Sequence, residues 1–142
     1  MASTTELLGQ ARTELINRCD AVEEAYEFML AYAGQGLASD SGSAKGTQVR
    51  EYLAKADAAL GALVTLASGF AQHDNTGDLA PYAAFMQVIG RDATAARAAV
   101  GLVLVQESIS SQVIDNLNAS IHLRALLTDL FLIDEVLKGH KA

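Results

Sequence analysis

The sequence predicts an all-α protein, folded as an antiparallel up-down-up-down bundle of four long helices. Four stretches of about 25–30 residues repeat their apolar residues at the helical period, and no stretch alternates apolar and polar residues as a strand does. Three connections rich in glycine and small polar residues separate these stretches. Two of the connections are short, which is typical of antiparallel neighbours in a helical bundle. The predicted helices span residues 4–33, 45–71, 80–105 and 110–138.

The first predicted helix, 4–33, starts behind a hydroxyl cap near Ser3 and places its apolar residues on one arc. Gly34 and Gly36 follow the last periodic residue, where glycines commonly end helices. The next segment, about 35–46, consists of small and polar residues, and we expect a flexible crossover there.

The second predicted helix, 45–71, has a single clean apolar stripe, and the polar segment 72–78 that follows it predicts a turn. Pro81 marks the first turn of the third helix. That helix is rich in alanine and contains Gly90 and Gly101, so it predicts a close neighbour rather than bulky packing.

The fourth predicted helix contains neither glycine nor proline, and its apolar residues fall on two arcs at 100° per residue. A broad arc provides the core face. Polar lines flank the second arc, with Asn118, His122 and Asp129 on one side and Arg124, Thr128 and Glu135 on the other. The second arc consists of Ile114, Ile121, Ala125, Leu132 and Val136. A helix apolar on two faces needs two surfaces to pack against, so the second arc is either an interface with another chain or a further internal contact.

Composition limits the classes of function. A chain of 142 residues is expected to form a single domain, 1–142. Its net charge of −7 argues against binding to nucleic acid or to anionic membranes. The single cysteine cannot form an intramolecular disulfide, and the first ten residues contain no basic region or apolar run. We therefore expect a cytoplasmic protein.

No spacing of side chains predicts a metal, a cofactor or a catalytic centre. Di-iron bundles need a Glu-x-x-His pair on each of two helices, and neither pair is present. Asp115, His122 and Asp129 lie in line, but seven residues span ~10.5 Å along a helix, too far to share one ion. Cys19 lies on an inward arc, which predicts an inert thiol. An acidic stripe on the first helix predicts a solvated face, with a basic docking partner or a cation site as the alternatives. The stripe consists of Asp20, Glu23, Glu24 and Glu27.

Three charged residues fall inside or beside apolar arcs near the middle of their helices: Arg18, Asp92 and Arg124. A buried charge persists only when it is paired. We therefore predict that Asp92 pairs with Arg18 or Arg124 in a structural polar layer. The alternative is a pocket, including Tyr26, in which the arginines bind a small anionic ligand.

These patterns favour a non-enzymatic interaction or accessory protein that forms a homodimer through the second arc of its last helix. Docking of another protein on the same arc is a further expectation. A helical bundle that binds a small anionic ligand at Arg18, Tyr26, Asp92 and Arg124 is the competing hypothesis.

Overall fold

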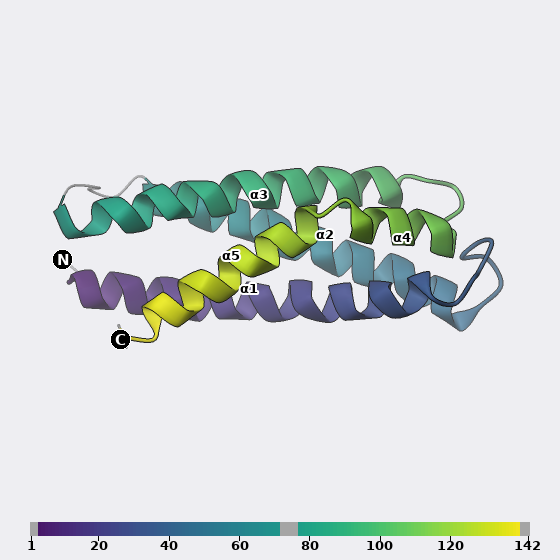
Figure 1. Ribbon diagram of the computed structural model, residues 1–142, viewed down its shortest axis with the longest axis horizontal. Coiled ribbons are helices and arrows are strands. Elements are labelled where there is room, and N and C mark those ends of the chain that lie inside the picture. The colour runs from purple at the N-terminus through teal and green to yellow at the C-terminus, as the bar shows by residue number, and fades with distance from the viewer. Residues whose placement is uncertain (1–2, 72–76, 140–142) are drawn as a thin grey trace.

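A computed structural model describes residues 3–71 and 77–139, and within these ranges the protein consists of five packed α-helices without strands (Figure 1). The all-α prediction is confirmed. The helices are α1 (Thr4–Ala33), α2 (Ala44–Ala71), α3 (Ala80–Leu104), α4 (Ser111–Ala119) and α5 (His122–Leu137), and a short 3₁₀ turn, Gly77–Leu79, precedes α3. The first three helices begin and end within one residue of their predicted bounds. Most of the predicted turn at 72–78 lies outside the described residues.

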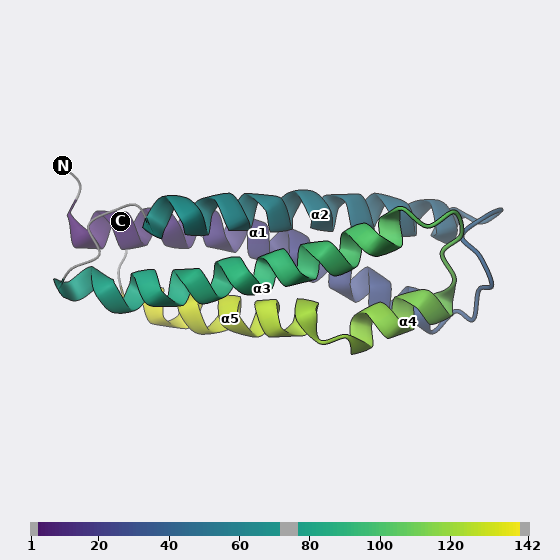
Figure 2. The same ribbon diagram turned by 90° about the horizontal axis from the view of Figure 1, so that it is seen from above.

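The helices run lengthwise along an elongated molecule (Figures 1 and 2). Helices α1, α2 and α3 alternate in direction, and α4 and α5 return along the remaining side, so that α5 ends at the end of the molecule where α1 begins. Helix α5 crosses over α1 on one flank and lies beside α3 on the other.

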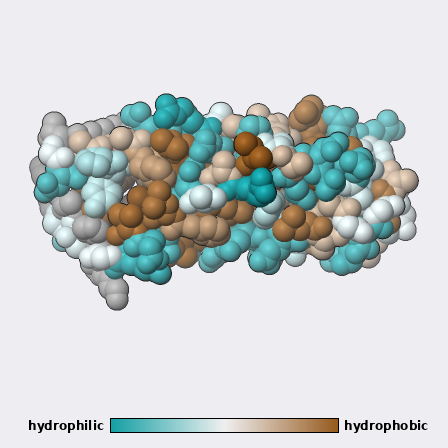
Figure 3. All heavy atoms as spheres, viewed as in Figure 1, coloured by the Kyte–Doolittle hydropathy of each residue, from teal (hydrophilic) through white to brown (hydrophobic). Residues whose placement is uncertain are grey.

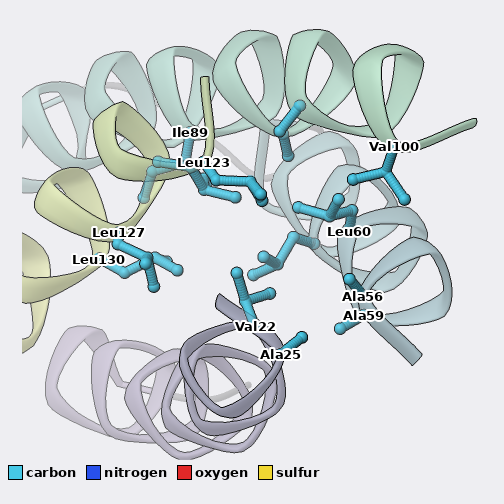
Figure 4. Packing of buried hydrophobic residues seen from close by; sticks show 14 of the residues in the cluster. Val22, Ala25, Ala56, Ala59, Leu60, Ile89, Val100, Leu123, Leu127 and Leu130 are labelled. Atoms are coloured by element: carbon cyan, nitrogen blue, oxygen red, sulfur yellow. The ribbon is translucent and has the colours of Figure 1, made fainter. Parts of the chain in front are cut away.

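One hydrophobic core runs between the helices and takes residues from all five of them. In the middle of the bundle, Val22 of α1, Leu60 of α2, Ile89 of α3 and Leu127 of α5 point toward one another (Figure 4). Small side chains take part in this core: Ala56 and Ala59 of α2 lie beside Ala25 of α1, and Ala93 and Ala96 of α3 are buried as well (Figure 4).

Small residues explain why α2 and α3 approach closely. A Cβ atom added to Gly90 would lie 3.2 Å from the Cβ of Ala67 on the facing helix. The predicted close neighbour of the third helix is therefore α2. Gly101 contributes nothing to this approach, because a Cβ there would meet no atom within 4 Å.

Helix α2 is also long and apolar enough between residues 44 and 70 to cross a membrane by length and composition, alone among the described helices. A core helix of a bundle passes the same test. In α2 the apolar residues Val49, Leu53, Leu60 and Leu63 are fully buried against the other helices.

The prediction of one continuous helix over 110–138 is wrong, because the helix is interrupted between α4 and α5. Ile121 adopts a left-handed conformation with φ of 67°, and it is the one non-glycine residue of the described chain with a positive φ. A β-branched residue rarely occupies this region. The break changes the direction of the chain, so that both halves bury their own apolar face: Ile114 and Leu117 from α4, and Leu123, Leu126, Leu130 and Ile133 from α5.

Contacts with the end of α1 hold α4 in place. The Tyr32 hydroxyl donates a hydrogen bond to the Ile109 carbonyl (2.7 Å), and the Ser111 hydroxyl donates to the Tyr32 carbonyl (2.7 Å). Ser111 also exchanges two hydrogen bonds with the backbone of Leu37. Further along, the Asn118 amide donates to the Met29 carbonyl at 3.2 Å. These fixed points leave α4 no freedom to continue in line with α5.

Arg50 ties two connections together at the same end of the bundle. Its Nε lies 2.5 Å from an oxygen of Asp40, whose other oxygen accepts a hydrogen bond from the Ile109 N–H at 2.7 Å. The two remaining guanidinium nitrogens donate to three carbonyl oxygens, those of Leu104, Gln106 and Glu107. The hydrogen bond from Arg50 keeps the pKa of Asp40 below its usual value. The crossover 35–46, predicted to be flexible, thus makes specific contacts around Asp40.

Candidate protein-interaction surface

Exposed apolar side chains gather along α5. The described chain exposes seven large apolar side chains, and four of them belong to α5 or to the residue that precedes it. These four are Ile121, Phe131, Leu132 and Val136, with exposed fractions of 54%, 50%, 55% and 46%. Because single exposed apolar residues are normal on any protein, the concentration on one element is the informative feature.

Two of these residues border an apolar hollow of about 350 Å³ between α3 and α5, which we call the α3–α5 groove. Figure 3 shows hydrophobic residues collected where α5 lies beside the first half of α3. None of the residues that line the groove carries a charge: they are Pro81, Tyr82 and Phe85 from α3, and Leu132, Ile133 and Val136 from α5.

The second arc predicted from the sequence is divided by the break at Ile121. Ile121, Leu132 and Val136 are exposed, and Ala125 is partly buried. Ile114 is fully buried in the core, so its assignment to a surface arc is wrong. The reason is geometric: α4 is not in line with α5, and residues that share a face on a straight helix do not share one here.

The side chains predicted to rim the arc also divide into two groups. His122, Arg124, Thr128 and Glu135 are exposed, as a rim requires. Asn118 is buried instead; it hydrogen-bonds to α1 through its amide group, and its Oδ1 has no hydrogen-bond partner. Asp129 is partly buried and faces α3.

The predicted pairing of Asp92 with Arg18 or Arg124 is wrong. Arg18 is exposed and lines a hollow between α1 and α2, Arg124 is exposed on α5, and no ion pair joins either arginine to Asp92 within the described ranges. Tyr26 is partly buried against the core. Equal height along the bundle does not bring side chains together when their helices turn them toward different neighbours.

Asp92 meets a second carboxyl group, that of Asp129. Burial, followed by the hydrogen bond and the negative charge of Asp92, raises the pKa of Asp129 to about 7. If both groups were ionised, the buried Oδ2 of Asp129 would have no donor. One proton held between the two carboxyl groups supplies a donor and removes the repulsion. Residue spacing along each helix does not indicate that Asp92 and Asp129 meet.

The remaining polar groups offer less chemistry. Burial and the nearby carboxylates of Glu23, Asp20 and Asp134 raise the pKa of Cys19 to about 11, so its thiol stays protonated and slow to react. Within the described ranges, no group of three or more histidine, cysteine, aspartate or glutamate side chains could hold a metal ion. The acidic stripe on α1 is exposed except for Glu23, which is partly buried.

Three comparisons with known proteins, against family models, curated proteins and solved structures, found no match. Function is therefore argued from the surface itself.

Proposed function

We propose that this protein is a non-enzymatic, cytoplasmic interaction or accessory protein that forms a homodimer through the α3–α5 groove and the exposed face of α5. The observation that carries the proposal is the exposure of Leu132 and Val136 at the edge of an uncharged apolar groove. Interfaces commonly combine an apolar centre with a polar rim. His122, Arg124, Thr128 and Glu135 supply such a rim along α5. In this proposal α4 and α5 together serve as the fourth pass of an up-down-up-down bundle.

A second copy of the chain fits this surface better than a charged partner does. A two-fold contact requires a patch that complements itself, with a ridge and a groove side by side. Leu132 and Val136 are exposed on the α5 wall of the groove, where they could enter the groove of a second copy, and the α3 residues Tyr82 and Phe85 supply the far wall. The lining carries no charge that would select an acidic or basic partner.

The negative charge of the protein predicts how the dimer responds to salt. Each copy carries a net charge of −7, so association brings like charges together. Salt screens such repulsion. We therefore expect the dimer to be strengthened, not weakened, as salt concentration rises. The same negative charge argues against nucleic acid as the partner.

Light scattering coupled to gel filtration tests the proposal. We expect wild type to elute with the mass of a dimer, and Leu132→Asp to elute as a monomer because a carboxylate cannot be buried unpaired at the interface. The matched control is Leu30→Asp, since Leu30 is 50% exposed on α1, away from the groove. Identical monomer masses for wild type and Leu132→Asp at every protein concentration would refute the dimer.

A further inference from the structure

A single residue separates α4 from α5. Ser120, which ends α4, has right-handed backbone angles (φ −65°, ψ −6°), and α5 begins at His122. Between them Ile121 is left-handed, with φ of 67° and ψ of −14°. The sequence contains no glycine or proline between residues 102 and 138. Rotation of Ile121 alone into the right-handed region would therefore join α4 and α5 into one helix.

The local chain favours this continuous helix over the observed break. A β-branched residue is disfavoured in the left-handed region. Ile121 also stands at the N-cap position of α5, where it makes no side-chain capping hydrogen bond. In a continuous helix, the N–H groups of residues 121–124 would donate to the carbonyl groups of residues 117–120. The break is therefore maintained by the packing of α5 and not by the preference of the chain at Ile121.

A straightened helix would carry α5 away from its own bundle. Hydrogen bonds from Ser111 and Asn118 to carbonyl groups of α1 hold α4 in place. In both views the axis of α4, continued past Ala119, departs from the line that α5 follows over α1 (Figures 1 and 2). An α5 on that axis would expose its core face and leave a vacant apolar surface on α1 and α3. The core face consists of Leu123, Leu126, Leu127, Leu130, Ile133 and Leu137.

We propose that α5 is exchanged between two copies of this chain: Ile121 becomes helical, and each α5 packs on α1 and α3 of the other copy. A second copy fits the vacant surface because its α5 carries the same six core residues. Its Asp134 also re-forms the ion pair with Arg12. The contacts of α5 with α1 and α3 are thus all remade between chains, and the two forms differ chiefly at Ile121. Exchange of an identical element is a low-cost route to a dimer.

This exchange goes beyond the proposed function and does not depend on it. The α3–α5 groove is present in both forms, since α3 and α5 pack together in either case, and Leu132 stays at its exposed edge. The exchanged dimer should form and dissociate slowly, because α5 must leave the core before it can be replaced. We therefore expect it to appear when the protein is refolded at high concentration and to persist on dilution.

Charge reversal across the α1–α5 contact tests the exchange. Arg12→Asp and Asp134→Arg each place two like charges at the site of the 2.9 Å ion pair. When the two variants are refolded together, both ion pairs are recovered only if each α5 packs on α1 of the other variant. We expect native mass spectrometry to show the ratio of mixed dimers to homodimers raised on the order of tenfold.

A second ion pair provides the matched control. Arg97 of α3 pairs with Asp57 of α2 at 3.1 Å, and both helices stay within their own chain during the exchange. Arg97→Asp mixed with Asp57→Arg has the same net charges as the first mixture, and we expect no enrichment of mixed dimers. The exchange is refuted if the Arg12 and Asp134 variants show no more enrichment than this control.

Variants of Ile121 test the residue that must rotate. Alanine favours the right-handed helix and disfavours the left-handed region, whereas glycine has neither preference, and an exchanged dimer contains two such residues. We expect the association constant of Ile121→Ala to exceed that of Ile121→Gly at least about a hundredfold in sedimentation equilibrium after refolding. Equal constants would overturn the role of Ile121.

The outcomes also separate the exchange from the groove contact. A dimer that is lost in Leu132→Asp but unaffected by either Ile121 variant supports the groove contact and refutes the exchange. A dimer that persists in Leu132→Asp and responds to Ile121 supports the exchange and refutes the groove contact. Monomers in wild type and in Ile121→Ala, even after refolding at high concentration, refute both.

Discussion

The left-handed residue between α4 and α5 leads to a prediction about stability. Alanine usually stabilises a helical protein more than glycine does, and at this position we expect the reverse. Ile121 has a φ of 67°, and its side chain is 54% exposed. Replacing it by alanine or by glycine removes the same buried part of the side chain. The two variants differ only in the Cβ atom, which is unfavourable in the left-handed region. We therefore expect Ile121→Gly to be more stable than Ile121→Ala.

The difference can be estimated from two opposing effects. The left-handed conformation costs an L-residue about 1–2 kcal/mol, and glycine avoids this cost. Glycine in turn gives the unfolded chain more conformational freedom, which disfavours folding by about 0.4–1 kcal/mol relative to alanine. The net advantage of Ile121→Gly is then about 0.5–1 kcal/mol, which corresponds to roughly 1–4 °C in Tm for a chain of this size.

Urea and thermal denaturation followed by helical circular dichroism measure this difference. Ala58 on α2 provides the control, because it is exposed within a regular helix and Ala58→Gly should destabilise the protein by about 0.5–1 kcal/mol. If Ile121→Ala proves as stable as Ile121→Gly, or more so, residue 121 is helical in solution. The uninterrupted helix predicted by the sequence would then be correct after all.

Three further predictions concern the rest of the fold. Arg50→Ala removes an ion pair and three hydrogen bonds to carbonyl groups, so we expect the free energy of unfolding in urea to fall by about 2–4 kcal/mol. The control, Arg97→Ala, removes an exposed ion pair and should lower it by less than about 1 kcal/mol. Gly46→Ala places a Cβ 1.7 Å from a backbone oxygen of the α1–α2 connection and should lower Tm strongly, whereas Gly69→Ala has open space and should raise it slightly. The pKa of Asp129 is about 7 in the folded protein and about 3.9 in the unfolded chain, so its contribution to stability is complete below about pH 3.9 and is lost as pH rises to about 7. The difference in unfolding free energy between wild type and Asp129→Asn should therefore change across that pH range and level off above it.

The sequence predicted the first three helices well because each carries a continuous signal. Apolar residues recur at the helical period, and the ends are marked by Ser3, Gly34 and Pro81. The break at Ile121 carries no such mark, since neither glycine nor proline is near. It is imposed by contacts between residues far apart in the chain, such as that of Ser111 with the end of α1. Local periodicity contains no information about those contacts.

The candidate surface was predicted in part for the same reason. Leu132 and Val136 lie within one regular helix, where angular position decides exposure. Their spacing predicts an outer face, and both are exposed. Ile114 lies across the break, so its angular position relative to α5 could not be obtained from residue spacing. The partner of Asp92 depends on which helix faces α3 at that point, and a count of residues along one helix does not reveal it.

The interactions of Arg50 also determine where the molecule should open first. They join the α1–α2 connection, the end of α3 and the start of α4 at one end of the bundle. At the other end, the last turns of α5 pack Ile133 and Leu137 into the core, and their one ion pair to another helix in the described chain is partly exposed, Arg12 with Asp134. Amide hydrogen exchange reports such local differences in stability. Amides of α4 should exchange slowly, and those at the end of α5 should exchange faster. If the proposed dimer forms, exchange at the end of α5 should slow selectively as protein concentration rises.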